Sequence, residues 1–313
     1  MRNFCVIGSI NVDMVARVPT FPESGQTLTG TSFTTAFGGK GANQAVALSR
    51  LGAPVSMCGK VGTDIFGARY LEEFRRKGVD DSHIGTNEGA TGVAVIEVEG
   101  SGANRIVVVP GANGAVDLDY IVSLTPRMRD YAYFLYQLEI PLESVSSAMA
   151  ASRTAGGVNV LDPAPARELP AAMYRNVDYI TPNETETALL TGIEPADAPS
   201  IRRAAAFFFD KGVHSVIIKG GGRGSWYLSP REAWWCPPFP LEAVDTTAAG
   251  DSFNAGFVYA LEEGRSPQEA CLFANAVAGL AITKLGAQAA MPSLEEARRL
   301  MSSHSDIAAS PLV

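Results

Sequence analysis

The sequence predicts an α/β fold of three layers, with helices on both faces of a mostly parallel central sheet and a small β-sheet lid beside it. Short apolar runs alternate with helical patterns along the chain, as in the βαβ units that build parallel sheets. Segments 92–99 and 105–109 are strand-like but have only the loop 100–104 between them, so they predict a hairpin outside that sheet. Polar residues able to do chemistry follow the ends of predicted strands, where open α/β sheets bind ligands.

Composition restricts the class of protein. With 313 residues, 46% hydrophobic and 19% charged, the chain can bury a large core as one large domain or as two, and of these we expect one domain over 1–313. A net charge of −8 argues against binding to nucleic acid. The four cysteines lack the spacing of a metal or disulfide motif, and no apolar run reaches the length of a signal peptide or membrane span, so we expect a cytoplasmic protein. Three histidines without a plausible partner exclude a Ser-His-Asp hydrolase.

The first apolar run, residues 4–10, predicts a buried strand whose end presents Asn11 and Asp13. Residues two apart on a strand point the same way. An amide and a carboxylate side by side can bind the hydroxyls of a sugar. They can equally cap and turn the loop, as Asn and Asp often do, and the residues alone favour that interpretation.

The lid is predicted from two segments, about 11–38 and 90–113. Residues 27–37 are rich in Thr and Phe with little charge, and the hairpin adds two β-branched strands. The run 111–113 closes the hairpin. A sheet that stands off the main body is suited to cover a site and exclude water from it.

Residues 38–41 (GGKG) precede a helical pattern over 42–48. The string suggests a phosphate loop, but the Walker pattern needs Ser or Thr after Gly-Lys, and here Gly41 follows Lys40. We therefore reject a Walker phosphate loop. From the residues alone, Lys40 is a solvated charge.

The middle of the chain continues the alternation of strands and helices. Strands are predicted at 55–59, at 131–138, within 158–166 where the strand ends in a rigid proline turn, and from 178, and helices at 68–77 and 145–153. We expect Asp64 to cap the first of these helices. Strand 131–138 brings Glu139 to the ligand-binding edge of the sheet. Asn183 and Glu186 lie one helical turn apart, and a capping box explains them adequately.

Residues 216–224 predict a strand followed by a glycine-rich loop. The loop is not a dinucleotide fingerprint, because that pattern needs Gly or Ala where Ser225 stands, although its backbone can still approach a nucleotide. We expect the aromatic residues that follow to pack and to form edge strands; they are Trp226, Tyr227, Trp234 and Trp235. A helix over 268–283, a turn over 284–290 and a loose tail over 302–313 complete the chain.

Residues 244–257 (VDTTAAGDSFNAGF) place small, flexible residues before an apolar pattern and predict a tight loop that opens a helix. The amides of Ala248, Ala249 and Gly250 should be unpaired there, at a helix N-terminus that carries about half a positive charge, which makes an anion site. Asp251 follows at once. Its simplest role is to accept a proton from a hydroxyl that attacks a phosphoryl group held by those amides. The alternative is that Asp251 is an ordinary acidic residue in the first turn of the helix, where Asp is favoured for capping alone.

Two strings together resemble signatures of the ribokinase family of carbohydrate kinases. Residues 245–256 are similar to the C-terminal signature of that family, and residues 37–45 (FGGKGANQA) to its N-terminal signature. The similarity extends from about Val6 to Pro292. It implies an ATP-dependent kinase of the primary hydroxyl of a pentose, with O5 of D-ribose as the first expectation. A kinase of deoxyribose, another sugar or a nucleoside, or an idle sugar or nucleotide sensor, stays open.

The resemblance also implies roles for individual residues. In the chemical step Asp251 is the general base, and the amides from Ala248 through Ala249 and Gly250 to Asp251 form an anion hole. The residues that hold the sugar are Asn11, Asp13, Gly39, Lys40, Asn43, Glu139 and Asp251. The residues that border the nucleotide are Asn183, Glu186, Lys219, Gly220, Gly221, Gly222, Arg223, Gly224, Gly250 and Asn275. Lys219 and the extra glycines depart from the pattern of the family, which leaves the nucleotide contacts open.

Two cations and a second subunit are implied as well. Asn183 and Glu186 serve the Mg²⁺ and phosphate end of the nucleotide through water. A monovalent cation, K⁺, binds largely to backbone carbonyls between the loop at 245–247 and the turn at 284–290. Its positions here are Asp245, Thr247, Ala281, Lys284, Gly286 and Ala290, the last standing where a hydroxyl side chain often contributes. The lid implies a homodimer.

Overall fold

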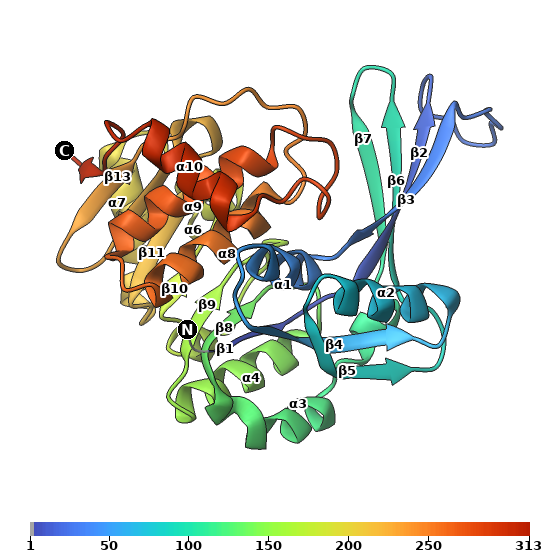
Figure 1. Cartoon of the computed structure of the whole chain (residues 1–313), viewed down its shortest axis with the longest axis horizontal. Coiled ribbons are helices and arrows are strands. Elements are labelled where there is room, and N and C mark those ends of the chain that lie inside the picture. The colour runs from blue at the N-terminus through green and yellow to red at the C-terminus, as the bar shows by residue number, and fades with distance from the viewer. Residues whose placement is uncertain (1–2) are drawn as a thin grey trace.

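The central sheet has ten strands, most of them parallel (Figure 1). The computed structural model describes residues 3–313. In chain order the strands of this sheet are β1 (Asn3–Ile7), β4 (Val55–Gly62), β5 (Asp80–Asn87), β8 (Tyr131–Tyr136), β9 (Val158–Leu161), β10 (Tyr179–Ile180), β11 (Ser215–Lys219), β12 (Ser225–Leu228), β13 (Ala233–Cys236) and β14 (Ser310–Pro311). In space their order is β14-β13-β12-β11-β10-β9-β8-β1-β4-β5, and every pair from β11 to β5 is parallel. The predicted parallel sheet is therefore confirmed.

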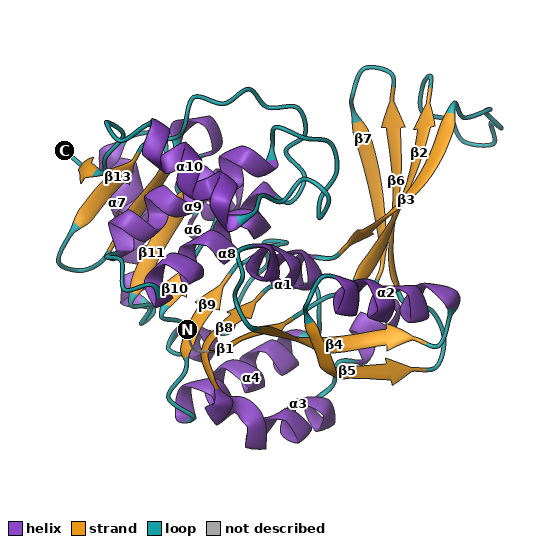
Figure 2. Cartoon of the chain, in the orientation of Figure 1, coloured by secondary structure: helices purple, strands orange, loops and turns teal. Residues whose placement is uncertain are grey.

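Helices cover both faces of this sheet and give the predicted three layers (Figure 2). One face carries α1 (Lys40–Arg50), α2 (Ile65–Arg76), α8 (Ala249–Glu262), α9 (Pro267–Ala281) and α10 (Leu294–Ser303). The other carries α3 (Leu118–Leu124), α4 (Leu142–Thr154), α5 (Ala171–Tyr174), α6 (Glu184–Thr191) and α7 (Ala198–Asp210). Three short 3-10 helices are η1 (Gly111–Ala115), η2 (Thr125–Asp130) and η3 (Gly221–Arg223). Successive side chains of β1 point to opposite faces of the sheet. Phe4 and Val6 therefore pack in the core beneath α1 and α8, and Cys5 and Ile7 in the core beneath α4 and α7.

A second sheet of four strands projects from the body (Figure 2). Its strands are β2 (Asn11–Val18), β3 (Ser32–Gly38), β6 (Gly92–Glu99) and β7 (Asn104–Val109), in the order β3-β2-β6-β7. β6 and β7 pair antiparallel, so the predicted hairpin is confirmed. The chain passes from the central sheet to the second sheet within residues 8–10, between β1 and β2. Asn11 therefore lies at the junction of the two sheets.

Asp64 caps α2, as predicted. Its Oδ1 accepts a hydrogen bond from the Gly67 amide at 2.9 Å, and the helix begins at Ile65, three residues before the predicted start. Its Oδ2 accepts from the Thr91 amide at 2.9 Å. Burial alone would raise the pKa of Asp64, but the hydrogen bonds from Thr91 and Gly67 hold it below its usual value. One carboxylate thus joins the start of a body helix to the residue that precedes β6.

The C-terminal segment is more ordered than the sequence predicts. The prediction of a loose tail over 302–313 is wrong, because α10 continues to Ser303 and β14 pairs antiparallel with β13. The Leu312 amide also donates to the Ala233 carbonyl at 2.9 Å. A short segment with few apolar residues gives no sign of this, because the free edge of β13 supplies the pairing partner. Within residues 3–313, no helix has the length and apolar character needed to cross a membrane.

Candidate active site

A cavity of about 1000 Å³ lies where the predicted anion site at 248–250 meets the carboxyl ends of the central strands. Asp162 follows β9, Asn183 follows β10 and Lys219 ends β11, and all three line the cavity. The start of α8 forms another wall. The predicted site residues on that wall are Ala248, Ala249, Gly250 and Asp251. The structure therefore brings the predicted anion site and much of the predicted nucleotide site into one space.

The loop before α8 has a strained backbone. Ala248 is the N-cap of the helix and adopts a left-handed conformation, with φ of 59° and ψ of 16°. It is the one non-glycine residue with positive φ in residues 3–313. Such a conformation costs a residue with a Cβ about 1–2 kcal/mol. Backbone strain of this kind is typical of sites where backbone groups must face a ligand.

The unpaired amides predicted at 248–250 need one correction. The Ala249 amide donates to the Thr246 carbonyl at 3.2 Å, because the chain makes a tight turn just before the helix. In residues 3–313, no backbone carbonyl accepts from the amides of Ala248, Gly250 or Asp251. These amides are at a helix N-terminus, where the macrodipole favours an anion.

Asp251 is held between α8 and α1. Its side chain is 6% exposed; Oδ2 accepts from Asn43 Nδ2 at 3.0 Å and Oδ1 accepts from Gln44 Nε2 at 3.1 Å. Burial, together with the charge of Asp162, raises the pKa of Asp251 to about 6, against the opposing effects of Lys40 and the two amide donors. A buried carboxylate with a pKa near 6 is ionised at neutral pH and able to accept a proton.

Asn43 is itself fixed by a chain of hydrogen bonds. Gln288 Nε2 donates to Asn43 Oδ1 at 3.2 Å and to the Tyr70 hydroxyl at 2.8 Å. The Tyr70 hydroxyl donates to the Gly38 carbonyl at 2.5 Å. The turn predicted near 284–290 thereby contacts the residue that orients Asp251.

The residues predicted to hold a sugar gather at the junction of the two sheets. Glu139 Oε2 accepts from the Ser9 hydroxyl at 2.5 Å and from the Lys40 amide at 3.1 Å. Gly39 has φ of 87°, and a Cβ there would lie 2.6 Å from the Asn11 amide nitrogen, so only glycine fits. A Cβ on Gly38 would meet Asp13 Oδ2 at 2.3 Å.

Asp13 has a raised pKa in this setting. Burial and the nearby charge of Glu139 raise it to about 6, and Lys40 partly offsets both. The two carboxylates thus face a common space, which Lys40 shares.

Lys40 is not the solvated charge that the residues alone predict. It is half-buried and lines the 1000 Å³ cavity together with the start of α8. Of the other residues predicted to hold the sugar, Asp251 lines this cavity and the rest do not. Burial opposes its charge, but Asp251, Asp162 and Glu139 together raise the pKa of Lys40 above its usual value. Lys40 is therefore protonated and lies between the two halves of the site.

The predicted nucleotide residues divide into those that reach the cavity and those that do not. Lys219 Nζ pairs with Asp162 Oδ1 at 2.9 Å inside it. Asn275 lines the cavity as well, and its Nδ2 donates to the Cys236 carbonyl at 2.9 Å and the Pro237 carbonyl at 3.0 Å. Of the glycine-rich loop after β11, Gly221, Gly222 and Gly224 line the cavity, as does Gly250 at the start of α8.

Asn183 and Glu186 form the capping box of α6. Asn183 Oδ1 accepts from the Glu186 amide and Glu186 Oε2 from the Asn183 amide, both at 2.8 Å. Both residues also line the cavity. Burial raises the pKa of Glu186, an effect that the charge of Lys219 partly offsets. The capping and cavity-facing interpretations are thus compatible.

Arg223 and Gly220 depart from the predicted nucleotide set, because neither lines the cavity. The Arg223 guanidinium bonds to Glu184 and to the Pro195 and Ala196 carbonyls, and it lies 4.8 Å from the Trp226 ring centroid. A Cβ on Gly220 would lie 2.4 Å from the Trp226 ring. Both positions therefore serve packing beside the predicted loop, and Trp226 is buried there as predicted.

The segments predicted to bind a monovalent cation contact each other. Asp245 accepts hydrogen bonds from the Thr247 amide at 2.9 Å, the Thr247 hydroxyl at 2.6 Å and the Gly286 amide at 2.9 Å. The side chain of Lys284 pairs with Glu296 on α10 at 3.0 Å, which leaves only its backbone for an ion. Ala281 and Ala290 are buried alanines, so they too offer only carbonyl oxygens. Backbone carbonyls and one carboxylate suit a hard cation.

The sequence analysis missed several residues of the site, among them Asp162, which pairs with Lys219 at 2.9 Å. Gln44 contacts Asp251, Ser9 contacts Glu139, and Asn113 Nδ2 donates to Asn11 Oδ1 at 2.7 Å. Asn113 also accepts from the Ile10 amide at 2.8 Å, so it fixes the chain where the sheets meet. Their positions in the sequence could have indicated two of them. Gln44 follows Asn43 in the glycine-containing string, and Asn113 ends the run that closes the hairpin.

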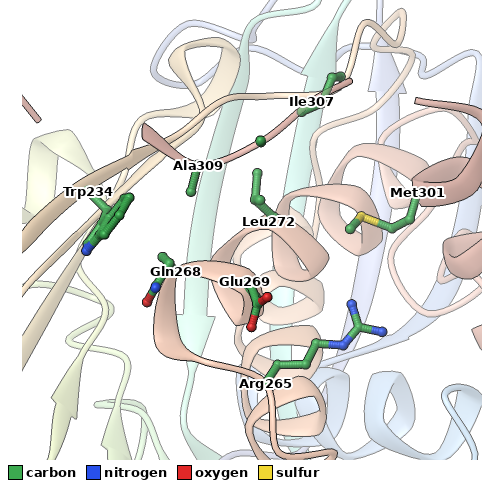
Figure 3. A pocket seen from close by; sticks show the side chains of 9 residues that line it. Trp234, Arg265, Gln268, Glu269, Leu272, Met301, Ile307 and Ala309 are labelled. Atoms are coloured by element: carbon green, nitrogen blue, oxygen red, sulfur yellow. The ribbon is translucent and has the colours of Figure 1, made fainter. Parts of the chain in front are cut away.

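A second cavity of about 510 Å³ lies at the start of α9 (Figure 3). Arg265, Gln268 and Leu272 form one side of it, and Met301 and the segment 307–309 another. None of the residues predicted for the site lines it. It serves below as a location for a control substitution.

Comparisons with known proteins point to one family. A family model described as pfkB family carbohydrate kinase matches residues 1–294. Ribokinase from Haemophilus influenzae is 42% identical over 296 residues, which cover 94% of this chain and 97% of that protein. Ribokinase from Bacillus subtilis is 39% identical over 306 residues, covering 96% and 100%. The structure of Arabidopsis thaliana ribokinase with ribose and ATP matches with a TM-score of 0.90 and 31% identity, covering 96% of this chain and 99% of that one.

The left-handed backbone of Ala248 leads to a stability prediction. Ala248→Val should lower the free energy of unfolding by about 1–2 kcal/mol, because a β-branched side chain clashes with its own backbone at positive φ. Ala248→Gly should be neutral or stabilising by up to about 1 kcal/mol. Urea unfolding measures both. The control is Ala155→Val, at an exposed position with φ of −77°, and an equal loss at both positions would contradict the prediction.

Proposed function

The chain belongs to the pfkB family of carbohydrate kinases, and on that premise we propose that it is a ribokinase that transfers the terminal phosphoryl group of ATP to O5 of D-ribose. The observation that carries the proposal is the position of Asp251. This carboxylate lies at the N-terminus of α8, lines the large cavity and accepts hydrogen bonds from α1. A hydroxyl beside it would face a phosphoryl group bound at the helix N-terminus.

In the proposed reaction, ionised Asp251 accepts the proton of the O5 hydroxyl as O5 attacks the terminal phosphorus. The bond from that phosphorus to the bridging oxygen of ATP breaks, and ADP leaves. The amides of Ala248, Gly250 and Asp251 donate to the phosphoryl oxygens and stabilise the charge that develops there. The Ala249 amide, which already donates to Thr246, helps to hold the turn.

Sugar recognition is assigned to the residues at the junction of the two sheets. Asn11 and Asp13 would bind hydroxyls of the ring, and Gly39 would let the backbone approach it. Asn43 and Glu139 complete this set. Lys40 would contact both the sugar and the transferred phosphoryl group, since it lines the cavity beside Asp251 and also feels the charge of Glu139.

The nucleotide is assigned to the large cavity, with Lys219, Gly221, Gly222, Gly224 and Asn275 along its walls. Asn183 and Glu186 would hold Mg²⁺ through water. Their oxygen atoms suit this hard cation, and Glu186 Oε1 is not used in the capping box. Mg²⁺ bound there would neutralise charge on the phosphate groups.

A monovalent cation, K⁺, is assigned to the contact between the Asp245 loop and the turn at 284–290. Asp245 and Thr247 would contribute from the loop, the carbonyl of Ala281 from the end of α9, and the carbonyls of Lys284 and Gly286 from the turn. Ala290 has no hydroxyl to add, so we expect the affinity or the ion preference to differ from that of relatives with one. The cation would stabilise the loop that precedes Ala248 and so the conformation of the anion hole.

The second sheet is proposed to act as a lid over the sugar and to pair two copies of the chain. Support comes from β7, where Ile106, Val107, Val108 and Val109 are all exposed apolar residues. A second copy would cover them, since a sheet with an uncovered apolar face favours association. We place the enzyme in the cytoplasm, where ATP is available.

The test of the substrate is a coupled ADP-release assay over ribose, deoxyribose, other pentoses, hexoses and nucleosides. The expected result is the highest kcat/KM for D-ribose, since one missing hydroxyl contact can cost orders of magnitude. A higher value for another compound would replace ribose by that compound. ATP turnover that does not depend on any added sugar or nucleoside would contradict the kinase assignment of this site.

Asp251→Asn should lower kcat about 10²- to 10⁴-fold, because an amide cannot accept the hydroxyl proton. Binding of ribose, measured by calorimetry, should persist. The matched control is Asp210→Asn, at an exposed carboxylate that ends α7, and it should retain full turnover. Undiminished turnover in Asp251→Asn would exclude Asp251 as the base.

The pKa of Asp251, raised to about 6, predicts how turnover depends on pH. Only the ionised carboxylate accepts a proton, so kcat should be constant above pH 7 and should fall about tenfold per unit well below pH 6. Because Asp13 also has a pKa of about 6, the Asp13→Asn variant separates the two groups. It should retain the acidic fall in kcat at saturating sugar. A flat profile from pH 5 to pH 8 would contradict the assignment.

A further inference from the structure

Gln44 connects the proposed base to the nucleotide cavity. It lies on α1, is fully buried, and donates from Nε2 to Asp251 Oδ1 and to Asp162 Oδ2, both at 3.1 Å. Its Oε1 accepts from Gln137 Nε2 at 2.7 Å. Every hydrogen-bonding group of the side chain therefore has a partner.

The surroundings permit only one orientation of the Gln44 amide. Turning it over would place its oxygen against the carboxylates of Asp162 and Asp251 and its nitrogen against the Gln137 nitrogen. The two contacts with the carboxylates would then be repulsive whichever way Gln137 lies, at a buried position where an unpaired polar group costs about 1–3 kcal/mol. The two carboxylates thus fix the orientation of Gln44, and Gln44 in turn holds both of them in place.

The second carboxylate belongs to the phosphate end of the site. Asp162 Oδ1 pairs with Lys219 Nζ at 2.9 Å, and both side chains line the nucleotide cavity. A single amide with two hydrogens therefore separates and orients two like charges. One of them is the proposed base and the other is the partner of a cavity lysine.

We propose that Gln44 is a positioning residue for phosphoryl transfer: it aims the Asp251 carboxylate at the acceptor hydroxyl and holds it apart from Asp162. The inference rests on the proposed function, since it needs Asp251 to act as the base. Gln44 contacts the base through one hydrogen bond and the Asp162–Lys219 pair through the other. A base that turns away from the hydroxyl loses rate even when both substrates bind normally.

The test is Gln44→Met, which keeps the size of the side chain and removes both donated hydrogen bonds. We expect kcat to fall about 10- to 100-fold, with KM for ribose and for ATP within about threefold of the wild type. The acidic fall in kcat should move to higher pH by less than about one unit, because the lost hydrogen bond favoured the ionised base. An unchanged kcat and pH profile would overturn the inference.

Two further variants control for damage to the fold. Gln268→Met makes the same chemical change in the second cavity (Figure 3) and should leave kcat and its pH profile unchanged. Should Gln44→Met fail to fold, Gln44→Glu keeps the shape and places a third carboxyl beside two others, so kcat should again fall at least about tenfold near pH 8. A folded Gln44→Glu enzyme with normal kcat would overturn the inference equally.

The Asp251→Asn background separates this inference from the proposed function. Without the base there is nothing for Gln44 to aim, so Gln44→Met should lower the residual turnover by less than about threefold. An equal loss in both backgrounds would show that Gln44 acts on the fold alone, and would overturn the inference. Full turnover in Asp251→Asn itself would instead remove the proposed base, whatever Gln44 does.

Discussion

The site depends on one carboxylate buried between two helices from distant parts of the chain. Asp251 on α8 has a hydrogen-bond donor for each oxygen, Asn43 and Gln44 on α1, at 3.0 and 3.1 Å. A buried carboxylate is costly unless it is hydrogen-bonded in this way. The packing of α1 on α8 therefore keeps the charge and sets its direction. Because the same helices form part of the core, the position of the proposed base depends on the packing of the whole body.

The charged residues in the cavity walls also depend on their surroundings. Its walls carry Asp162, Glu186 and Asp251 against the two lysines Lys40 and Lys219. The raised pKa values of Asp251 and Glu186 follow from burial among like charges. Such a wall is a poor receptor for bare phosphate groups. In the proposed enzyme the helix N-terminus and a cation that arrives with the nucleotide supply the missing positive charge.

The backbone contributes as much as the side chains. Ala248 holds a left-handed conformation at the start of α8, and Gly39 a positive φ at the start of α1. Both residues immediately precede the helices that hold Asp251 and Asn43. Each position turns the chain so that amide groups and side chains face one region. Glycine adopts positive φ without steric cost, so the strain lies at Ala248, and the core packing of α8 offsets its cost.

The sequence by itself determined the alternation of strands and helices, the lid hairpin and the cap at Asp64, because these depend on local periodicity and on capping groups a few residues apart. The two glycine-containing strings also indicated the region of the site. Only the tertiary structure decided that Asn43 and Asp251, 208 residues apart, are in contact, and that Gln44 connects Asp251 to Asp162. It also turned Arg223 away from the cavity. Side-chain direction depends on neighbours that folding brings from remote segments, and a local pattern does not contain them.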